Sequence, residues 1–143
     1  MLTSCLWATV FGARRCACLE FTGPGGTVPG VTLKGVRLAG SAPERLAGWM
    51  FRRVPGTAGL WLEPCASVHT WWMRFEVDLA FLAWRDGVAT VLHVERRVAP
   101  WRVVSCREAE AVLEAVAGAL DGVGQGWSVR KAPCSCRCCC GLC

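Results

Sequence analysis

The sequence lacks a hydrophobic run long enough to cross a membrane, although 53% of its 143 residues are hydrophobic. A membrane-spanning helix needs about 18 to 20 consecutive apolar residues. The apolar N-terminal segment also lacks preceding basic residues, and Arg14 and Arg15 follow it instead. This order is the reverse of that in a secretory signal. We therefore expect no membrane span and a cytoplasmic protein.

An excess of one charge is also missing from the main part of the chain. Residues 31–130 hold twelve basic and ten acidic side chains, a net charge of +2, whereas the whole chain carries +5. Proteins that bind nucleic acid usually carry a strongly basic face. The charge distribution therefore gives no case for nucleic acid, and we expect none as a partner. A chain of this length suits a single domain.

Cysteine is scarce in the centre of the chain, where only Cys65 and Cys106 occur, although the sequence has 11 cysteines. A disulfide-stapled secreted domain would distribute its cysteines through its loops. Six cysteines instead crowd the last ten residues: Cys134, Cys136, Cys138, Cys139, Cys140 and Cys143. Their thiolates suit a soft metal, but the two separated C-x₂-C pairs of a structural zinc finger are absent. We expect residues 131–143 to be a disordered tail, with a soft metal bound there as the alternative and otherwise no cofactor.

Glycine and proline divide the chain into segments. Residues 1–30 end in a glycine- and proline-rich stretch and are expected to be a poorly structured extension, before a domain at residues 31–130. Ser41 and Glu44 have the spacing of a capping box, which predicts a short helix. Runs rich in β-branched and aromatic residues predict strands at 31–38 (irregular at Gly35), 59–62, 68–75, 77–84 and 88–98. Asp86-Gly87 predicts a hairpin between the last two, so the middle of the domain should be an antiparallel meander.

A series of short motifs occurs in a fixed order along the chain: Gly48, Met50-Phe51-Arg52, Gly59-Leu60, Pro64-Cys65, Val68-His69-Thr70, Met73-Arg74, Val77-Asp78, Phe81-Leu82, Pro100 and Gly118. In order and spacing they resemble the domain of unknown function 192 family over about residues 36–129. The resemblance implies a mainly β domain, an antiparallel β-sandwich or jelly-roll-like fold with one or two short helices. It implies no established activity, and relatives in this family include exported forms.

The segment 106–120 gives two conflicting signals. Its alanine-rich composition and the Ser105 to Glu108 spacing favour a helix. The family resemblance instead implies a strand at about 111–116 and a short helix near 117–121. We expect the strand, because pairing within a sheet can override intrinsic helix propensity.

Cys65 and His69 could form a thiol and imidazole pair, in which a base lowers the pKa of a nucleophile. Four residues of extended strand span on the order of 13 Å, so the pair meets only if the chain between them turns back. No third residue is evident to orient the imidazole. The alternative is that Cys65 is buried and His69 is a half-buried strand residue.

The neighbouring residues Trp71 and Trp72 should point to opposite faces of the strand expected at 68–75. We expect Trp71 to be buried, because it shares a face with Met73 and Phe75. Trp72 would then be exposed and could line a ligand groove or a partner surface. A second small core that buries both is the alternative.

Asp78 lies within an apolar strand, where an unpaired carboxylate is costly. Arg52 and Arg74 are the expected partners, in a salt bridge that ties the loop after the helix to the sheet. A ligand-binding acid is the alternative.

These observations predict a small binding or accessory module that takes a small molecule or a protein at its aromatic face. The candidate ligand-binding residues are His69, Trp71, Trp72, Asp78, Arg52 and Arg74. One alternative is a thiol- or metal-dependent enzyme that uses Cys65, His69 or the cysteine-rich tail. The other is a structural partner subunit that docks through the tryptophan face.

Overall fold

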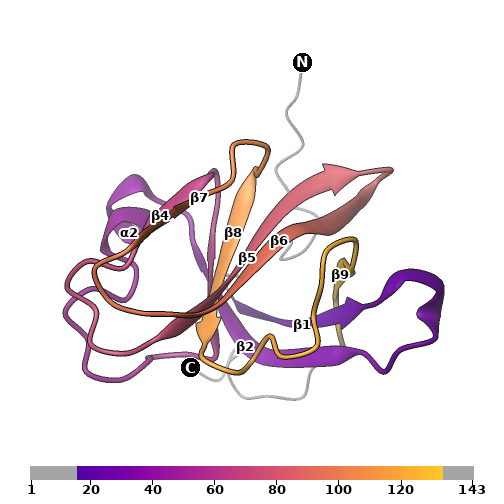
Figure 1. The fold of residues 1–143 in the computed structure, drawn as a ribbon, viewed down its shortest axis with the longest axis horizontal. Coiled ribbons are helices and arrows are strands. Elements are labelled where there is room, and N and C mark those ends of the chain that lie inside the picture. The colour runs from indigo at the N-terminus through magenta and orange to yellow at the C-terminus, as the bar shows by residue number, and fades with distance from the viewer. Residues whose placement is uncertain (1–15, 134–143) are drawn as a thin grey trace.

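The computed structural model describes residues 16–133 (Figure 1). Nine strands, one α-helix and one 3-10 helix form this part of the chain. In sequence order they are β1 (Cys16–Thr22), η1 (Pro24–Gly26), β2 (Val31–Ala39), α2 (Ala42–Ala47), β3 (Gly59–Leu62), β4 (Ser67–His69), β5 (Val77–Arg85), β6 (Val88–Val98), β7 (Val103–Ser105), β8 (Ala111–Val116) and β9 (Ser128–Lys131). The predicted mainly β fold is confirmed.

Seven of the strands close into a barrel in the order β1-β2-β3-β8-β5-β6-β9, with β9 pairing back onto β1. The expectation of a β-sandwich or jelly-roll-like sheet is therefore wrong. β2 and β3 pair in parallel, so the chain between them must cross over, and this crossover contains α2. β4 and β7 form a separate two-stranded sheet. Figure 1 shows this small sheet and α2 on one side of the barrel, opposite the connection between β1 and β2.

The strands β3, β5 and β8 are buried on both faces, which explains their nearly continuous apolar sequences. Ala111, Leu113 and Ala115 of β8 join the core that fills the barrel together with Trp61. Val112, between them, joins a second core that also includes Trp49, Val68 and Met73. This second core joins residues of the barrel wall to residues of β4 and of the loop after α2. A polar residue on the outer face of β8 is consequently buried.

β8 occupies the residues expected for it, 111–116, in spite of the helical propensity of this segment. It pairs with β3 on one side and with β5 on the other, so sheet pairing outweighs propensity here. The helix expected near 117–121 does not form. These residues make turns, and Gly118 has a φ of 89°, outside the helical range.

β1 lies in the segment that was expected to be a poorly structured extension, and this expectation is wrong for residues 16–22. Ala17, Leu19 and Phe21 alternate along β1 and are fully buried. The strand pairs with β2 and β9 and so closes the barrel. Residues 1–15 and 134–143 lie outside the described part of the chain, so the tail cysteines Cys134, Cys136, Cys138, Cys139, Cys140 and Cys143 and their metal site stay predictions.

Two local motifs form as their residues predict. Ser41 accepts a hydrogen bond from the Glu44 backbone N–H, and the Glu44 carboxylate accepts one from the Ser41 N–H, which completes the capping box of α2. Asp86 and Gly87 have φ values of 49° and 76° at the β5–β6 turn, the backbone conformation of a tight hairpin.

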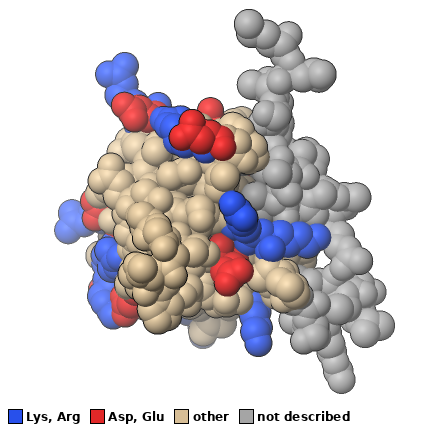
Figure 2. Space-filling model, turned by 90° about the vertical axis from the view of Figure 1, so that its right-hand side faces the viewer, with Lys and Arg blue, Asp and Glu red and all other residues tan. Residues whose placement is uncertain are grey.

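Charged side chains do not form a continuous basic patch on the face shown in Figure 2, which is the side of the β1–β2 connection. Acidic and basic residues lie next to one another around an uncharged area of this face. None of the helices within residues 16–133 is long and apolar enough to span a membrane.

Candidate functional site

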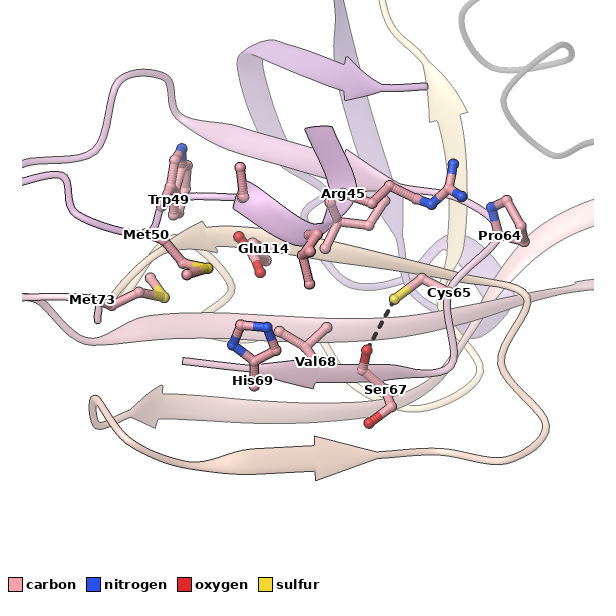
Figure 3. Close-up of a pocket in the computed structure, with 14 residues that line it drawn as sticks. Arg45, Trp49, Met50, Pro64, Cys65, Ser67, Val68, His69, Met73 and Glu114 are labelled. Carbon is pink, nitrogen blue, oxygen red and sulfur yellow. Dashed lines mark hydrogen bonds between the residues drawn. The ribbon is translucent and has the colours of Figure 1, made fainter. Parts of the chain in front are cut away.

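A cavity of about 210 Å³ lies between α2, the residues that follow it, β4 and β8 (Figure 3). Its walls include apolar side chains of the second core, such as Trp49, Leu62 and Met73, together with Met50. The Cys65 thiol, the His69 imidazole and the Glu114 carboxyl, which are ionisable groups, also line it.

Glu114 is the most unusual group in this cavity. It lies on the outer face of β8 between Leu60 of β3 and Leu79 of β5, and only 3% of its surface is exposed. Burial raises the pKa of its carboxyl from 4.5 to about 7. Its Oε2 atom is buried and has no hydrogen-bond partner. The carboxyl of Glu114 is therefore placed to receive a partner that the described residues do not supply.

Gly48 ends α2 beside this carboxyl. A Cβ atom at position 48 would lie 3.5 Å from Glu114 Oε2, and Gly48 has a φ of 45°. Residues other than glycine rarely adopt this backbone conformation. The glycine thus ends the helix and forms one wall beside Glu114.

His69 stands on β4, at the edge of the same cavity. Its Nδ1 atom is buried and lacks a hydrogen-bond partner, while its ring packs at 5.0 Å from the ring of Trp71. Figure 3 shows the His69 imidazole and the Glu114 carboxyl both directed into the cavity, beside the sulfur atoms of Met50 and Met73. Two residues from separate strands, each with an unsatisfied buried polar atom, thus line one cavity.

Cys65 also lines the cavity, where a thiol and imidazole pair with His69 would need its Sγ to face the imidazole. However, the Cys65 Sγ donates its hydrogen bond to the Ser67 carbonyl oxygen at 3.2 Å. Burial raises the pKa of this thiol. The thiol is therefore protonated at neutral pH and is a weak nucleophile.

The comparisons with known proteins establish the family. The sequence profile of DUF192, described as "Uncharacterized ACR", matches residues 27–130. The chain belongs to the DUF192 family. No activity is established for the family. No curated protein matches the chain in sequence.

Two solved structures have the same fold as this DUF192 protein. One is a proposed transcription regulator from Sinorhizobium meliloti 1021, with a TM-score of 0.67 and 20% identity, over 82% of this chain and 95% of that one. The other is a protein of unknown function from Novosphingobium aromaticivorans DSM 12444, with a TM-score of 0.68 and 20% identity, over 84% of this chain and 88% of that one. At this identity the likeness concerns the fold alone.

Asp78 of the DUF192 motif Val77-Asp78 is buried, but it has different partners from those expected. Its Oδ1 accepts a hydrogen bond from the Arg97 backbone N–H at 2.9 Å. Its Oδ2 accepts from the N–H groups of Gly118 at 2.9 Å and Leu120 at 3.1 Å. Asp78 thus connects two parts of the chain. One is the place where the pairing of β5 with β6 shifts register, and the other is the turn after β8.

The expected ion pair of Asp78 with Arg52 or Arg74 is wrong, since within residues 16–133 neither arginine forms a salt bridge with it. Both arginines are exposed. Backbone N–H groups at a bulge and a tight turn have no ladder partner, so a buried carboxylate can satisfy three of them at once. Asp78 lies outside the cavity lining, whereas His69 lies in it.

The strand expected at 68–75 ends at His69, and the expectation that Trp71 is buried is wrong. Trp71 is 46% exposed and Trp72 is 51% exposed. The chain turns at Thr70, whose hydroxyl donates to the Ala99 carbonyl at 2.7 Å and accepts from the Arg102 N–H at 2.9 Å. After this turn the alternation of a strand no longer applies. Trp71 is directed outward and Met73 inward.

Glu114 was not among the residues selected from the sequence, although a signal was present. It interrupts the apolar run of β8 between Leu113 and Ala115, in the same way that Asp78 interrupts β5. Among the described residues, no group of three or more His, Cys, Asp or Glu side chains could hold a metal ion. The cavity therefore offers hydrogen bonds and an apolar wall.

Proposed function

We propose that this protein is a small-molecule binding module whose site is the cavity between α2, β4 and β8. One observation carries the proposal. The two buried side-chain atoms that lack a hydrogen-bond partner in residues 16–133, Glu114 Oε2 and His69 Nδ1, belong to residues that line this same cavity. An unsatisfied buried polar atom costs about 1–3 kcal/mol, so a ligand that bonds to both would recover much of this free energy.

The chemistry of the two atoms favours a ligand that donates hydrogen bonds. A carboxylate only accepts, and the Nδ1 atom of a neutral histidine accepts when the proton is on Nε2. A primary ammonium group has three donors and neutralises the Glu114 charge. Arg45 does not compete for this role, because its Nη1 donates to the carbonyls of Gly40 at 3.1 Å and Glu63 at 3.2 Å. Figure 3 shows its guanidinium directed toward Pro64, away from Glu114.

The remaining walls select a small apolar body for the ligand. Leu62, Val68 and Met73 are buried apolar residues of the lining, and the indole of Trp49 can attract a nearby cation. At about 210 Å³ the cavity is smaller than the pockets that take drug-sized molecules. A primary amine with a short hydrocarbon chain matches the size of the cavity, its apolar walls and the acceptor chemistry of the two polar atoms.

The proposal predicts that butylammonium raises the melting temperature of the full chain, whereas butanol and butyrate do not. Binding should strengthen as the pH rises through about 7, because the carboxylate form of Glu114 is the one that attracts the cation. Thermal melts at millimolar probe concentrations, followed by titration calorimetry, measure both effects. Glu114→Gln and His69→Ala should each weaken binding by about tenfold, the loss of one buried hydrogen bond to a charged group.

Two matched controls are available in the same chain. Glu95→Gln and His93→Ala alter exposed side chains on β6 that lie outside the cavity, and they should leave binding unchanged. Equal binding of butylammonium by wild-type protein and Glu114→Gln would refute the proposed site. A similar stabilisation by butanol would show an apolar cavity without recognition of the amine.

A thiol-based enzyme that uses Cys65 and His69 is less well supported than ligand binding. The two residues share the cavity, but the Cys65 thiol is directed to the Ser67 carbonyl and its pKa is raised. Catalytic cysteines instead have a lowered pKa, which supplies the reactive thiolate.

A further inference from the structure

Three exposed aromatic side chains from separate loops contact one another on the surface, and we name them the aromatic cluster. They are Phe51, Trp72 and Trp101, with exposed fractions of 66%, 51% and 56%. The rings of Phe51 and Trp72 stack with centroids 5.7 Å apart and planes at 26°. Trp101 meets Trp72 edge-on, with centroids 4.8 Å apart. A contiguous exposed patch of this kind is typical of an interaction site.

All three residues of the aromatic cluster have an unfavourable backbone conformation. Their φ values are 62°, 64° and 66°, in the left-handed region that bulky residues rarely occupy. The loops are held together by backbone hydrogen bonds from Phe51 N–H to the Trp72 carbonyl at 3.0 Å and from Trp101 N–H to the Thr70 carbonyl at 3.1 Å. Strained backbone conformations cluster at functional sites. Three exposed aromatic residues in such conformations therefore indicate a binding surface.

The loops of the aromatic cluster carry a basic charge. Residues 50–58, 70–76 and 99–102 contain four arginines and one acidic residue, all of them exposed: Arg52, Arg53, Arg74, Arg102 and Glu76. Val54 and Val103, also on or next to these loops, are 71% and 59% exposed and enlarge the apolar surface. The surface therefore combines aromatic and aliphatic side chains with positive charge.

This combination fits an anionic lipid surface better than a nucleic acid. Stacking on nucleic-acid bases requires open ring faces. In the aromatic cluster, one face of Phe51 lies against one face of Trp72, and Trp101 meets Trp72 edge-on, so only the outer ring faces are open to bases. Tryptophan side chains at a membrane interface insert their amphipathic rings at the level of the headgroups, and nearby arginines bind anionic lipids.

We propose that the aromatic cluster docks this protein peripherally on membranes that contain anionic lipids. Phe51, Trp72 and Trp101 enter the interface, and the arginines of the same loops pair with lipid phosphates. The docking surface is independent of the ligand proposed for the cavity, because none of the three aromatic residues lines that cavity.

Sedimentation of the full chain with lipid vesicles tests the proposal. The protein should bind vesicles of phosphatidylcholine with about one third phosphatidylglycerol, should bind pure phosphatidylcholine vesicles much less, and should dissociate as salt is added. Trp72→Gly should weaken this binding by about tenfold. It should not unfold the protein, because glycine readily adopts the φ of 64° found at this position. Trp101→Gly should behave in the same way.

Two further variants separate docking from folding. Val28→Ala removes an exposed apolar side chain on the β1–β2 connection, far along the chain from the aromatic cluster, and should leave vesicle binding unchanged. Arg53→Glu with Arg102→Glu should weaken binding to the phosphatidylglycerol vesicles without a change in melting temperature. Vesicle binding that survives in folded Trp72→Gly and in the charge-reversed variant would overturn the proposal. Binding of a single-stranded oligonucleotide in place of the vesicles would overturn it in favour of a nucleic-acid surface.

Discussion

Replacing Asp78 by alanine should lower the free energy of unfolding by about 3 kcal/mol, which is the cost expected for the loss of a buried charged group and its partners. The carboxylate is fully buried and accepts hydrogen bonds from the backbone of Arg97, Gly118 and Leu120. Alanine would leave these three N–H groups without their acceptor. Urea denaturation of the wild-type and variant proteins, analysed at equal m-values, measures the difference.

The surface residue Asp121 supplies the control for this experiment. Its side chain is 57% exposed, and its contact with Arg97 at 3.4 Å is a surface pair. Asp121→Ala should change stability by less than about 0.5 kcal/mol. Arg52→Ala and Arg74→Ala should also have small effects, because neither side chain pairs with Asp78. A loss below about 1 kcal/mol in Asp78→Ala would contradict the anchoring role.

The stability of the protein should fall as the pH rises from about 5 to about 8, and Glu114 should be responsible for a large part of the change. Its folded-state pKa is about 7, above the usual 4.5, so the folded state holds this proton more tightly than the unfolded state. The contribution to stability is therefore fully present below pH 4.5 and is lost as the pH passes 7. The free energy of unfolding that Glu114 contributes therefore differs by about 3 kcal/mol between low and high pH, because one pKa unit corresponds to about 1.4 kcal/mol.

Glu114→Gln should remove this part of the pH dependence, since glutamine fills the same space and does not titrate. The variant should be more stable than the wild-type protein at pH 8 and should lose that advantage near pH 5. Glu95→Gln, an exposed carboxyl on β6, should keep the wild-type pH profile. Denaturation curves at several pH values decide the matter. Parallel profiles for wild-type protein and Glu114→Gln would show that Glu114 titrates near its usual pKa.

Local sequence signals predicted those parts of the fold that local interactions form. The capping box of α2 and the turn at Asp86-Gly87 depend on residues within a few positions of each other, and both are present. β8 was placed through the family resemblance, since its alanine-rich sequence on its own favours a helix. Its two neighbours, β3 and β5, are distant in sequence, and only their pairing explains the strand.

The candidate site was harder to predict than the fold. His69 was selected from the sequence and does line the cavity, as does Cys65. Glu114 was missed because a single acidic residue in an apolar strand does not show which face of the strand is covered. Trp71 was wrongly assigned to the core, because the turn at Thr70 depends on hydrogen bonds to Ala99 and Arg102, about thirty residues away.

The sequence by itself determined a single mainly β domain of the DUF192 family, because strand propensities, breakers and ordered motifs are encoded in neighbouring residues. Only the tertiary structure decided that seven strands close into a barrel, and that α2 and β4 cover the outer face of β8. Closure depends on the pairing of β1 with both β2 and β9. The residues of β1 and β9 that pair are more than 100 positions apart in the sequence. The buried state of Glu114 and the exposed state of Trp72 follow from this packing, because burial is a property of the assembled layers and no short stretch of sequence contains it.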